Sequence, residues 1–254
     1  MKFLKNKYLI DDILNSEHPS DFETTKEYGI LILRLPFIKE SRVEVYSYAF
    51  LIKENEVYIF NREKQDFEKL GGYEDLYNYL DVRIDKILAK LNKFHMQIAK
   101  IEDNLYENNI PKTFSNEWLK LKKELVLIER LMAHAMIAFE RFIKYYKLQE
   151  NFAFVDLNEH INRSFRFAKN AIEKLDYLYE FYKAKQDEKM NKIMFILTIL
   201  SGIFLPLSLV TGFFGMNTGG LPLTHDPYGT IKAVIIAFIL DIPIIFLIWK
   251  YMRR

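Results

Sequence analysis

The sequence predicts an α+β protein in which a small N-terminal α/β domain leads into a long helical stalk and two C-terminal transmembrane helices. Three observations predict this fold. Strand-like runs are confined to the first eighty residues, no Gly or Pro interrupts residues 156–192, and two long apolar segments lie near the C-terminus. These patterns are typical of strands, of an unbroken amphipathic helix and of membrane spans, respectively.

The first predicted part, residues 1–80, is a small cytoplasmic α/β domain. Residues 30–35, 43–52 and 57–60 alternate apolar with polar side chains or are rich in β-branched residues, and turn-like segments separate them. Such runs favour short strands of a sheet. Gly71 and Gly72 mark a break after the strands.

The second predicted part, residues 81–192, is a cytoplasmic helical hairpin followed by a stalk helix. Residues 76–108 and 116–148 have helical apolar spacing, and Pro111 lies in the short connection between them. Ser115 is expected to cap the second helix. A third helix is expected from about Asp156, with an apolar stripe that predicts packing on other helices and on symmetry mates. The stripe contains Leu157, Ile161, Phe165, Ala168, Ile172, Leu175 and Tyr182.

The third predicted part, residues 193–254, is a transmembrane domain. Residues 193–214 carry no charge, and residues 233–249 carry only Asp241. A helix of about 20 residues spans a hydrocarbon core of roughly 30 Å. The sequence therefore predicts a first span at 193–214, an outer loop at 215–230 and a second span at 231–250. Asp241, an ionisable group within the second span, could be a proton carrier or a lateral contact to a polar group on the first span.

Basic residues predict the orientation of the two spans. Positive side chains flank the cytoplasmic ends of spans, and the connecting segment 217–230 has no Lys or Arg. Lys232 is a mild exception. Both termini are therefore expected in the cytoplasm, with a multi-pass arrangement in the inner (plasma) membrane and no N-terminal signal peptide. The flanking residues are Lys185, Lys189, Lys192, Lys250, Arg253 and Arg254.

Composition limits the function classes. The formal charge of +2 gives no support to a nucleic-acid partner, and the absence of cysteine excludes disulfides and thiolate metal sites. Phosphate-binding glycine loops and nucleophile elbows are not found, so an enzyme is not expected. No cofactor is predicted.

The end of the first span carries the most specific motif, Gly215, Met216 and Asn217. With the preceding residues 204–208 and Gly212, it resembles the CorA family of divalent-cation channels, whose signature is Gly-Met-Asn at this place. The resemblance covers the final hundred residues well and the N-terminal domain in outline. It implies a homopentameric funnel in which the first spans line a central pore, the second spans face membrane lipid, and Mg²⁺, Co²⁺ or Zn²⁺ is transported.

The resemblance assigns roles to particular residues. A ring of Asn217 carbonyl oxygens would hold the hydration shell of an entering cation, while Gly215 allows the chain to turn and Met216 packs beneath it. Met194 and Leu205 would form hydrophobic constrictions. Helix packing is the alternative for the small residues, and a simple helix C-cap is the alternative for Asn217. The residues expected to line the pore are Asn191, Met194, Thr198, Ser201, Leu205, Ser208 and Gly212.

The ion and its regulation are left open by the sequence. The loop 218–222 has no acidic residue and is similar to the zinc-transporting ZntB branch, which favours Zn²⁺ or broad divalent transport; His225 and Asp226 are the loop groups that could attract cations. A strict Mg²⁺/Co²⁺ channel and a non-conducting coiled-coil scaffold are the alternatives. Asp156 matches an acidic metal-sensing site between neighbouring subunits in the family, or else belongs to a solvated acidic patch.

Overall fold

The computed structural model describes residues 6–39, 42–216, 220–223 and 225–252. It divides into two compact units, Met1–Glu180 and Phe181–Arg254. The elements, in chain order, are α1 (Lys7–Leu14), β1 (Asp21–Thr24), β2 (Gly29–Lys39), β3 (Arg42–Lys53), β4 (Glu56–Asn61), β5 (Asp66–Gly71), α2 (Tyr73–Tyr106), α3 (Phe114–Tyr145), α4 (Phe152–Phe214) and α5 (Gly229–Met252).

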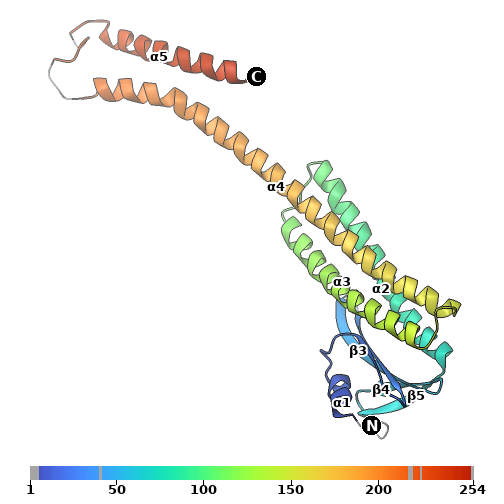
Figure 1. Ribbon diagram of the computed structural model, residues 1–254. Helices are drawn as coiled ribbons and strands as arrows, with labels where there is room; N and C mark the ends of the chain where they lie inside the picture. The colour runs from blue at the N-terminus through green and yellow to red at the C-terminus, as the bar shows by residue number, and fades with distance from the viewer. Residues whose placement is uncertain (1–5, 40–41, 217–219, 224, 253–254) are drawn as a thin grey trace. The chain divides into compact units, whose positions relative to one another are not determined.

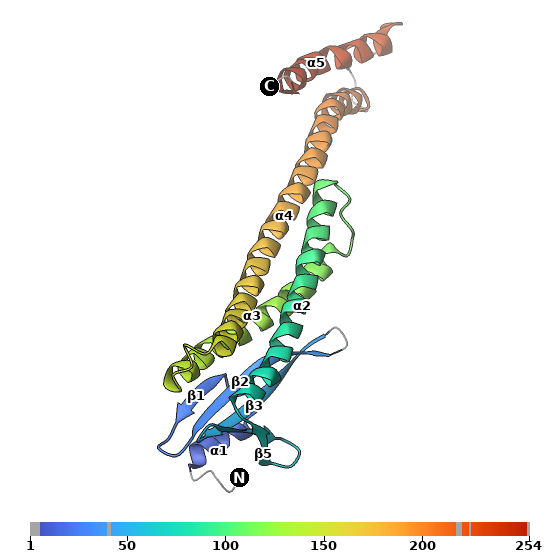
Figure 2. The same cartoon turned by 90° about the vertical axis from the view of Figure 1, so that its right-hand side faces the viewer.

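The sheet of the first unit is an antiparallel meander. Its strand order is β1-β2-β3-β4-β5, so each strand pairs with its neighbours in the sequence (Figures 1 and 2). The longest ladder joins β2 to β3, from Gly29 opposite Ile52 to Lys39 opposite Arg42. Strands β2, β3 and β4 contain the three predicted runs, whereas β1, β5 and α1 were not predicted.

Strand β2 is buried on both faces. Ile30 and Ile32 join a core cluster with Ile13 of α1, whereas Leu31 and Leu33, which point to the opposite face, are also fully buried. On that second face α3 packs against β1 and β2, and α2 packs against β2, β4 and β5. Coverage of both faces explains why the sequence of β2 is a continuous apolar run rather than a strict alternation.

The helical hairpin predicted from the sequence is formed by α2 and α3, and the N-terminal part of α4 lies beside both helices (Figures 1 and 2). Trp118 of α3 donates a hydrogen bond from Nε1 to the carbonyl oxygen of Leu175 (3.0 Å) and stacks on Tyr179 of α4 (ring centroids 4.3 Å apart). Ser115 is not the cap, because α3 already begins at Phe114 after Thr113.

Helix α4 is continuous, as predicted, but begins at Phe152 rather than near Asp156. Of the predicted stripe, Leu157, Ile161, Ala168 and Leu175 are buried, and the other three residues are partly exposed. The remaining buried positions of α4 are Phe154, which precedes the stripe, and Ser164, Ala171 and Leu178, which fall between its members. The small side chains at 164, 168 and 171 allow close approach of α4 to its neighbours within the first unit.

Tyr146, directly after α3, joins the helices to the sheet. Its hydroxyl donates to the carbonyl oxygen of Ile52 (3.4 Å), and burial raises the pKa of the Tyr146 phenol to about 12. Replacing Tyr146 with Phe is expected to lower the free energy of unfolding by about 1 kcal/mol at neutral pH. Since the unfolded phenol ionises near pH ~10, wild-type stability should fall as pH rises from about 10 to about 12, through the folded pKa.

Tyr145→Phe is the matched control, because Tyr145 is adjacent and 54% exposed. Denaturant unfolding of the purified chain, followed by tryptophan fluorescence at neutral and alkaline pH, would measure both effects. Removal of the Tyr146 phenol should reduce the alkaline loss of stability, and removal of the Tyr145 phenol should not. An alkaline loss that is the same in both variants would contradict this account.

Candidate functional site

All seven residues predicted to line a pore lie on α4, and all seven are exposed in the single chain. Their spacing of three or four residues confines them to an arc of roughly 100° around the helix, given about 3.6 residues per turn. The structure therefore presents them as one continuous surface, which we call the α4 stripe. It consists of Asn191, Met194, Thr198, Ser201, Leu205, Ser208 and Gly212.

Threonine hydroxyls on this part of α4 bond back to their own helix. Thr198 Oγ1 donates to the carbonyl oxygen of Met194 (2.8 Å), and Thr211 Oγ1 donates to the carbonyl oxygen of Leu207 (3.0 Å). Each hydroxyl proton is thereby satisfied without a second helix. The oxygen lone pairs of Thr198 remain on the exposed α4 stripe, where they can accept a hydrogen bond from the water of a hydrated ion.

The other side chains of α4 between residues 193 and 214 are mostly apolar, and many of them are exposed as well. Leu197 is 62% exposed, Phe204 60% and Leu209 68%. Among the described residues α4 is the helix long and apolar enough to cross a membrane, and the described part of α5 supplies a shorter apolar stretch, Gly229–Ile239. A helix with apolar side chains on every side is stable in lipid or against other helices rather than in water.

Gly215 and Met216 follow the last turn of α4. The Gly215 N–H donates to the carbonyl oxygen of Thr211 (2.9 Å), and a Cβ at Gly215 would lie 3.0 Å from that oxygen. Tight space, rather than a left-handed backbone, therefore explains glycine here. Met216 is 51% exposed in the single chain. Asn217 lies outside the described residues, and so does the side chain of Asp241.

The loop carboxylate is neutralised by a lysine. Asp226 forms an ion pair with Lys232 at the start of α5 and accepts a hydrogen bond from the Tyr228 N–H (2.9 Å). The hydrogen bond from Lys232, and then that from Tyr228, hold the pKa of Asp226 below its usual range. Asp226 therefore does not present a free negative charge to an approaching cation, in contrast to the role expected from the sequence. His225 is exposed.

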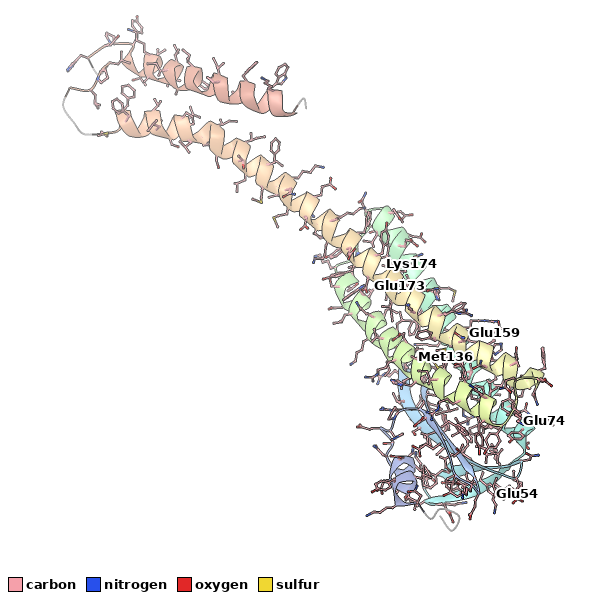
Figure 3. All side chains as sticks on the ribbon, viewed as in Figure 1. Glu54, Glu74, Met136, Glu159, Glu173 and Lys174 are labelled. Carbon is pink, nitrogen blue, oxygen red and sulfur yellow. The ribbon has the colours of Figure 1, made fainter. Side chains whose placement is uncertain are left out.

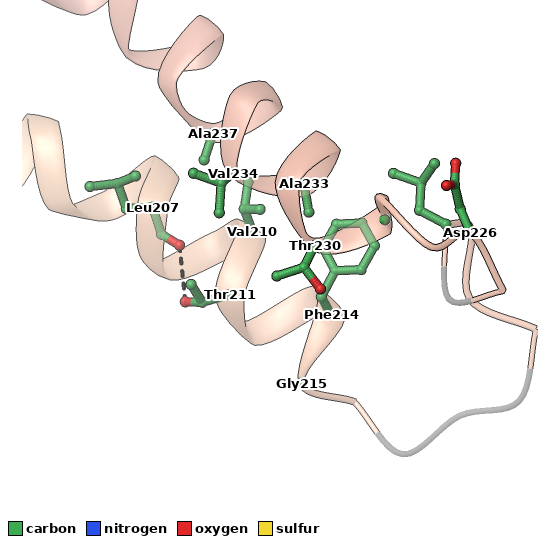
Figure 4. Close-up of a pocket in the computed structure, with 12 residues that line it drawn as sticks. Leu207, Val210, Thr211, Phe214, Gly215, Asp226, Thr230, Ala233, Val234 and Ala237 are labelled. Atoms are coloured by element: carbon green, nitrogen blue, oxygen red, sulfur yellow. Dashed lines mark hydrogen bonds between the residues drawn. The ribbon is translucent and has the colours of Figure 1, made fainter.

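A cavity of about 570 Å³ lies between the end of α4 and the start of α5 in the second unit (Figure 4). Apolar and small side chains dominate its walls, among them Val210, Phe214, Ala233 and Ala237, and Asp226 lies at one end. Small residues at this contact allow two helices to approach closely. The cavity thus marks the packing seam between the helices, away from the α4 stripe.

Asp156, the predicted metal-sensing residue, lies in the first turns of α4 and is joined there by three other groups. His160, one turn further along α4, faces two carboxylates of α2: its Nδ1 lies 3.7 Å from an oxygen of Asp81 and 3.7 Å from an oxygen of Asp85. His160 Nε2 lies 3.7 Å from an oxygen of Asp156. We call these four residues the α2–α4 cluster; Glu159, labelled in Figure 3, marks the turn of α4 that carries His160.

The sequence analysis did not predict that Asp81 and Asp85 lie near Asp156. Their spacing of four residues puts both on one face of α2, which is a pattern visible in the sequence. What the sequence did not show is that this face meets the start of α4. Three other carboxylates of the first unit have partners elsewhere: Asp66 accepts from the Phe67 N–H, Glu68 pairs with Lys64, and Asp75 accepts from the Gly72 N–H.

Several proteins with sequences similar to this chain are named as transporters of metal cations. The zinc transport protein ZntB of Yersinia enterocolitica is 24% identical over 185 residues, which cover 70% of this chain and 56% of the relative. The chain thus spans about half the length of the curated relatives it matches. It belongs to the CorA family, since the model of the CorA-like Mg²⁺ transporter protein matches residues 2–254.

Solved structures show the same fold. The complete CorA magnesium transporter of Methanocaldococcus jannaschii aligns with a TM-score of 0.72 at 18% identity, covering 100% of this chain and 84% of that one. The full-length CmaX protein aligns with a TM-score of 0.71 at 20% identity, covering 98% and 81%. The predicted family, and the predicted α/β domain followed by a long helix, are confirmed.

Proposed function

We propose that this chain is one subunit of an oligomeric channel that carries divalent metal cations across a membrane. The observation that carries the proposal is the α4 stripe: small, hydroxyl and amide side chains recur on one face of an otherwise apolar helix and remain exposed in the single chain. One helix per subunit cannot enclose a pore, so several copies must bring their stripes together around an axis. The family resemblance makes a homopentamer the proposed assembly.

The proposed topology keeps the parts expected from the sequence. Residues 193–214 and 231–250 are the two spans in the inner membrane, residues 215–230 connect them outside, and residues 1–80 and 81–192 stay in the cytoplasm with both termini. The exposed apolar surfaces of α4 and α5 support the spans. The lysines and arginines that flank them support the orientation.

The proposed selectivity rests on neutral oxygen ligands. Gly215, Met216 and Asn217 form the selectivity filter of the proposal, with five Asn217 amides at the mouth. Neutral oxygens hold a hydrated cation by its water molecules, which suits ions that lose water reluctantly. Names of relatives support both Zn²⁺ and Mg²⁺ as cargo. We therefore propose Zn²⁺ or broad divalent transport, including Co²⁺, with a strict Mg²⁺/Co²⁺ channel as the alternative.

Transport by the purified protein tests the proposal. The full chain is reconstituted in liposomes, and uptake of Zn²⁺ and of Mg²⁺ is measured separately, with and without an imposed pH gradient. Zn²⁺ uptake that the gradient increases would support proton-coupled zinc transport, and Mg²⁺ entry that ignores the gradient would support a magnesium channel. Absence of flux for both ions from correctly assembled protein would overturn the proposal in favour of a membrane-anchored scaffold.

The Asp226–Lys232 pair predicts how charge at the outer mouth affects uptake. Replacing Lys232 with Gln frees the carboxylate of Asp226, so cations should concentrate at the mouth. At low ionic strength the half-saturating cation concentration in the liposome assay is expected to fall about twofold, and salt should abolish the difference. Lys250→Gln, at the other end of α5, is the matched control. An effect of equal size in that variant, or one that survives high salt, would exclude local electrostatics as the cause.

A further inference from the structure

A row of polar side chains crosses the sheet of the first unit. Arg34 of β2 lies opposite Ser47 of β3 in the ladder, and residues directly opposite each other point to the same face. Continuing the β3–β4 register, in which Phe50 lies opposite Ile59, puts Arg62 opposite Ser47, just after the end of β4. Arg62 Nε donates to the carbonyl oxygen of Ser47 (3.1 Å), in agreement with that register. We call Arg34, Ser47 and Arg62 the basic row.

Both arginines of the basic row reach the end of α1. By strand alternation, Arg34 shares a face with Ile32, which lies in the core cluster beneath α1. Arg34 Nη1 donates to the carbonyl oxygen of Glu17 (2.9 Å), and Arg62 Nη1 donates to that of Leu14 (3.2 Å). Cations near the last carbonyls of a helix are favourable. These bonds fasten α1 to the sheet but leave other guanidinium nitrogens unused.

Three donors of the basic row are buried and have no hydrogen-bond partner among the described residues. They are Nε of Arg34, Oγ of Ser47 and Nη2 of Arg62. Nor does either arginine form an ion pair with a carboxylate in the described part of the chain. A buried donor without a partner costs free energy, and a partly buried charge without a counter-charge costs more. Three such donors side by side suit one acceptor that carries several oxygens and negative charge.

The chemistry of these donors favours a doubly charged oxyanion. Guanidinium groups stay protonated at physiological pH, so the basic row carries two positive charges. Their planar forks match the oxygens of carboxylate and phosphate groups, and hydrogen bonds to an ionised oxygen are stronger than neutral ones. The hydroxyl of Ser47 adds a donor between the two forks. A phosphoryl group offers three acceptor oxygens and up to two negative charges, which match the row in number and in sign.

The spacing of the basic row suits a single small anion. Cross-strand neighbours on one face have β carbons about 4.5–5.5 Å apart, so those of Arg34 and Arg62 are roughly 9–11 Å apart with Ser47 between them. Two long side chains can close on one tetrahedral ion across that span. Ser47 is 5% exposed, whereas both arginines are partly exposed. An anion can therefore reach the row from solvent between the arginine side chains.

We propose that Arg34, Ser47 and Arg62 bind one phosphate-type oxyanion beside the end of α1, as the free ion or as the phosphoryl group of a small metabolite. The two guanidinium groups neutralise its charge, and the serine hydroxyl donates the central hydrogen bond. Bound anion links three neighbouring strand positions to the end of α1, so it stabilises the first unit. This inference goes beyond the proposed channel, because it needs neither transport nor a partner subunit.

Binding of inorganic phosphate to the purified full chain in detergent tests the inference. Titration calorimetry in phosphate-free buffer of low ionic strength gives the affinity and the stoichiometry, and glycerol phosphate and sodium chloride are titrated in parallel. The variants are Arg34→Gln, Ser47→Ala and Arg62→Gln. Arg42→Gln is the matched control, since Arg42 is an exposed arginine of β3, five residues before Ser47 and so on the opposite face of the strand.

We expect one phosphate per chain in the wild type and in Arg42→Gln, with an affinity at least about tenfold lower in Arg34→Gln and Arg62→Gln. Ser47→Ala should weaken binding about fivefold. Glycerol phosphate that binds as well as phosphate would assign the site to a phosphoryl group, and its exclusion would assign the site to the free ion. Absence of phosphate binding, equal binding by all variants, or equal competition by chloride would overturn the inference.

Ser47→Ala distinguishes the anion from an ordered water if the arginine variants fail to fold. Without phosphate, removal of a hydroxyl that has no partner among the described residues should leave the thermal unfolding midpoint unchanged or higher. Saturating phosphate should raise the midpoint of the wild type more than that of the variant. A midpoint that is lower in Ser47→Ala by the same amount with and without phosphate would mean that water satisfies the hydroxyl, and the inference would be wrong.

Discussion

Replacing Asn217 with Ala is expected to reduce divalent-cation uptake into liposomes by at least about 100-fold. If each amide contributes about 1 kcal/mol to holding the hydrated ion, a ring of several copies contributes more than the roughly 2.7 kcal/mol that corresponds to that factor. The substitution removes the carbonyl oxygen but leaves the span and the assembly surfaces unchanged. Initial uptake rates at one cation concentration, normalised to protein in the liposomes, give the measurement.

The control for this experiment is Thr218→Ala, which shortens the next side chain but leaves the Gly-Met-Asn signature intact. Its uptake should stay within about twofold of the wild type, since a change on the order of 0.4 kcal/mol corresponds to that factor. Size-exclusion chromatography of both proteins shows whether the oligomer survives. Normal flux through an assembled Asn217→Ala protein would mean that the amide ring does not control entry.

The second large effect is expected at Leu205, where the α4 stripe is most apolar. Leu205 is 68% exposed in the single chain and would point into the proposed pore as a hydrophobic constriction. A narrow apolar ring resists wetting, and a serine there removes about 1.5–3 kcal/mol of hydrophobic side chain per subunit. Leu205→Ser should therefore raise resting flux at least about tenfold, for which 1.4 kcal/mol is sufficient.

Ile196→Ser is the matched control for the constriction. Ile196 is nine residues earlier on α4, which places it on the opposite side of the helix, and it is 56% exposed. The same loss of apolar surface there should leave resting flux unchanged, although it weakens contact with lipid. Flux measured at zero and at saturating Zn²⁺ on the inner side separates constriction from regulation. A rise in flux for Ile196→Ser and none for Leu205→Ser would place the pore on the other face of α4.

The sequence was informative where apolar periodicity is long. It located β2, β3 and β4 from apolar or β-branched runs, and it located the helices of the hairpin and the unbroken α4 from apolar residues at a helical period. Strand β1 has four residues, of which only Phe22 is buried, and β5 buries only Phe67. A segment that buries one side chain has too little apolar periodicity to be predicted as a strand from the sequence. Such a strand forms because it pairs with a longer neighbouring strand.

The candidate site residues also differ in whether a regular sequence pattern could reveal them. The α4 stripe follows from helical spacing alone, so every member could be placed on one face in advance. The α2–α4 cluster depends on which face of α2 meets α4, and that contact is a tertiary property. His160 lies close to Asp81 and Asp85 of a different helix, and no spacing along the chain indicates that approach. Neutralisation of Asp226 by Lys232 likewise depends on how the loop enters α5.

The neighbour-to-neighbour order of the sheet has a consequence for biosynthesis. Each strand needs only the one made just before it, so pairing closes short loops and the entropic cost of folding is low. The first unit is complete at Glu180, before the apolar residues 193–214 have been made. A folded unit can therefore form at the ribosome while the membrane segment is still being translated. In the proposed topology only the C-terminal hairpin then has to enter the bilayer, and the unit already folded behind it would oppose export of the N-terminus.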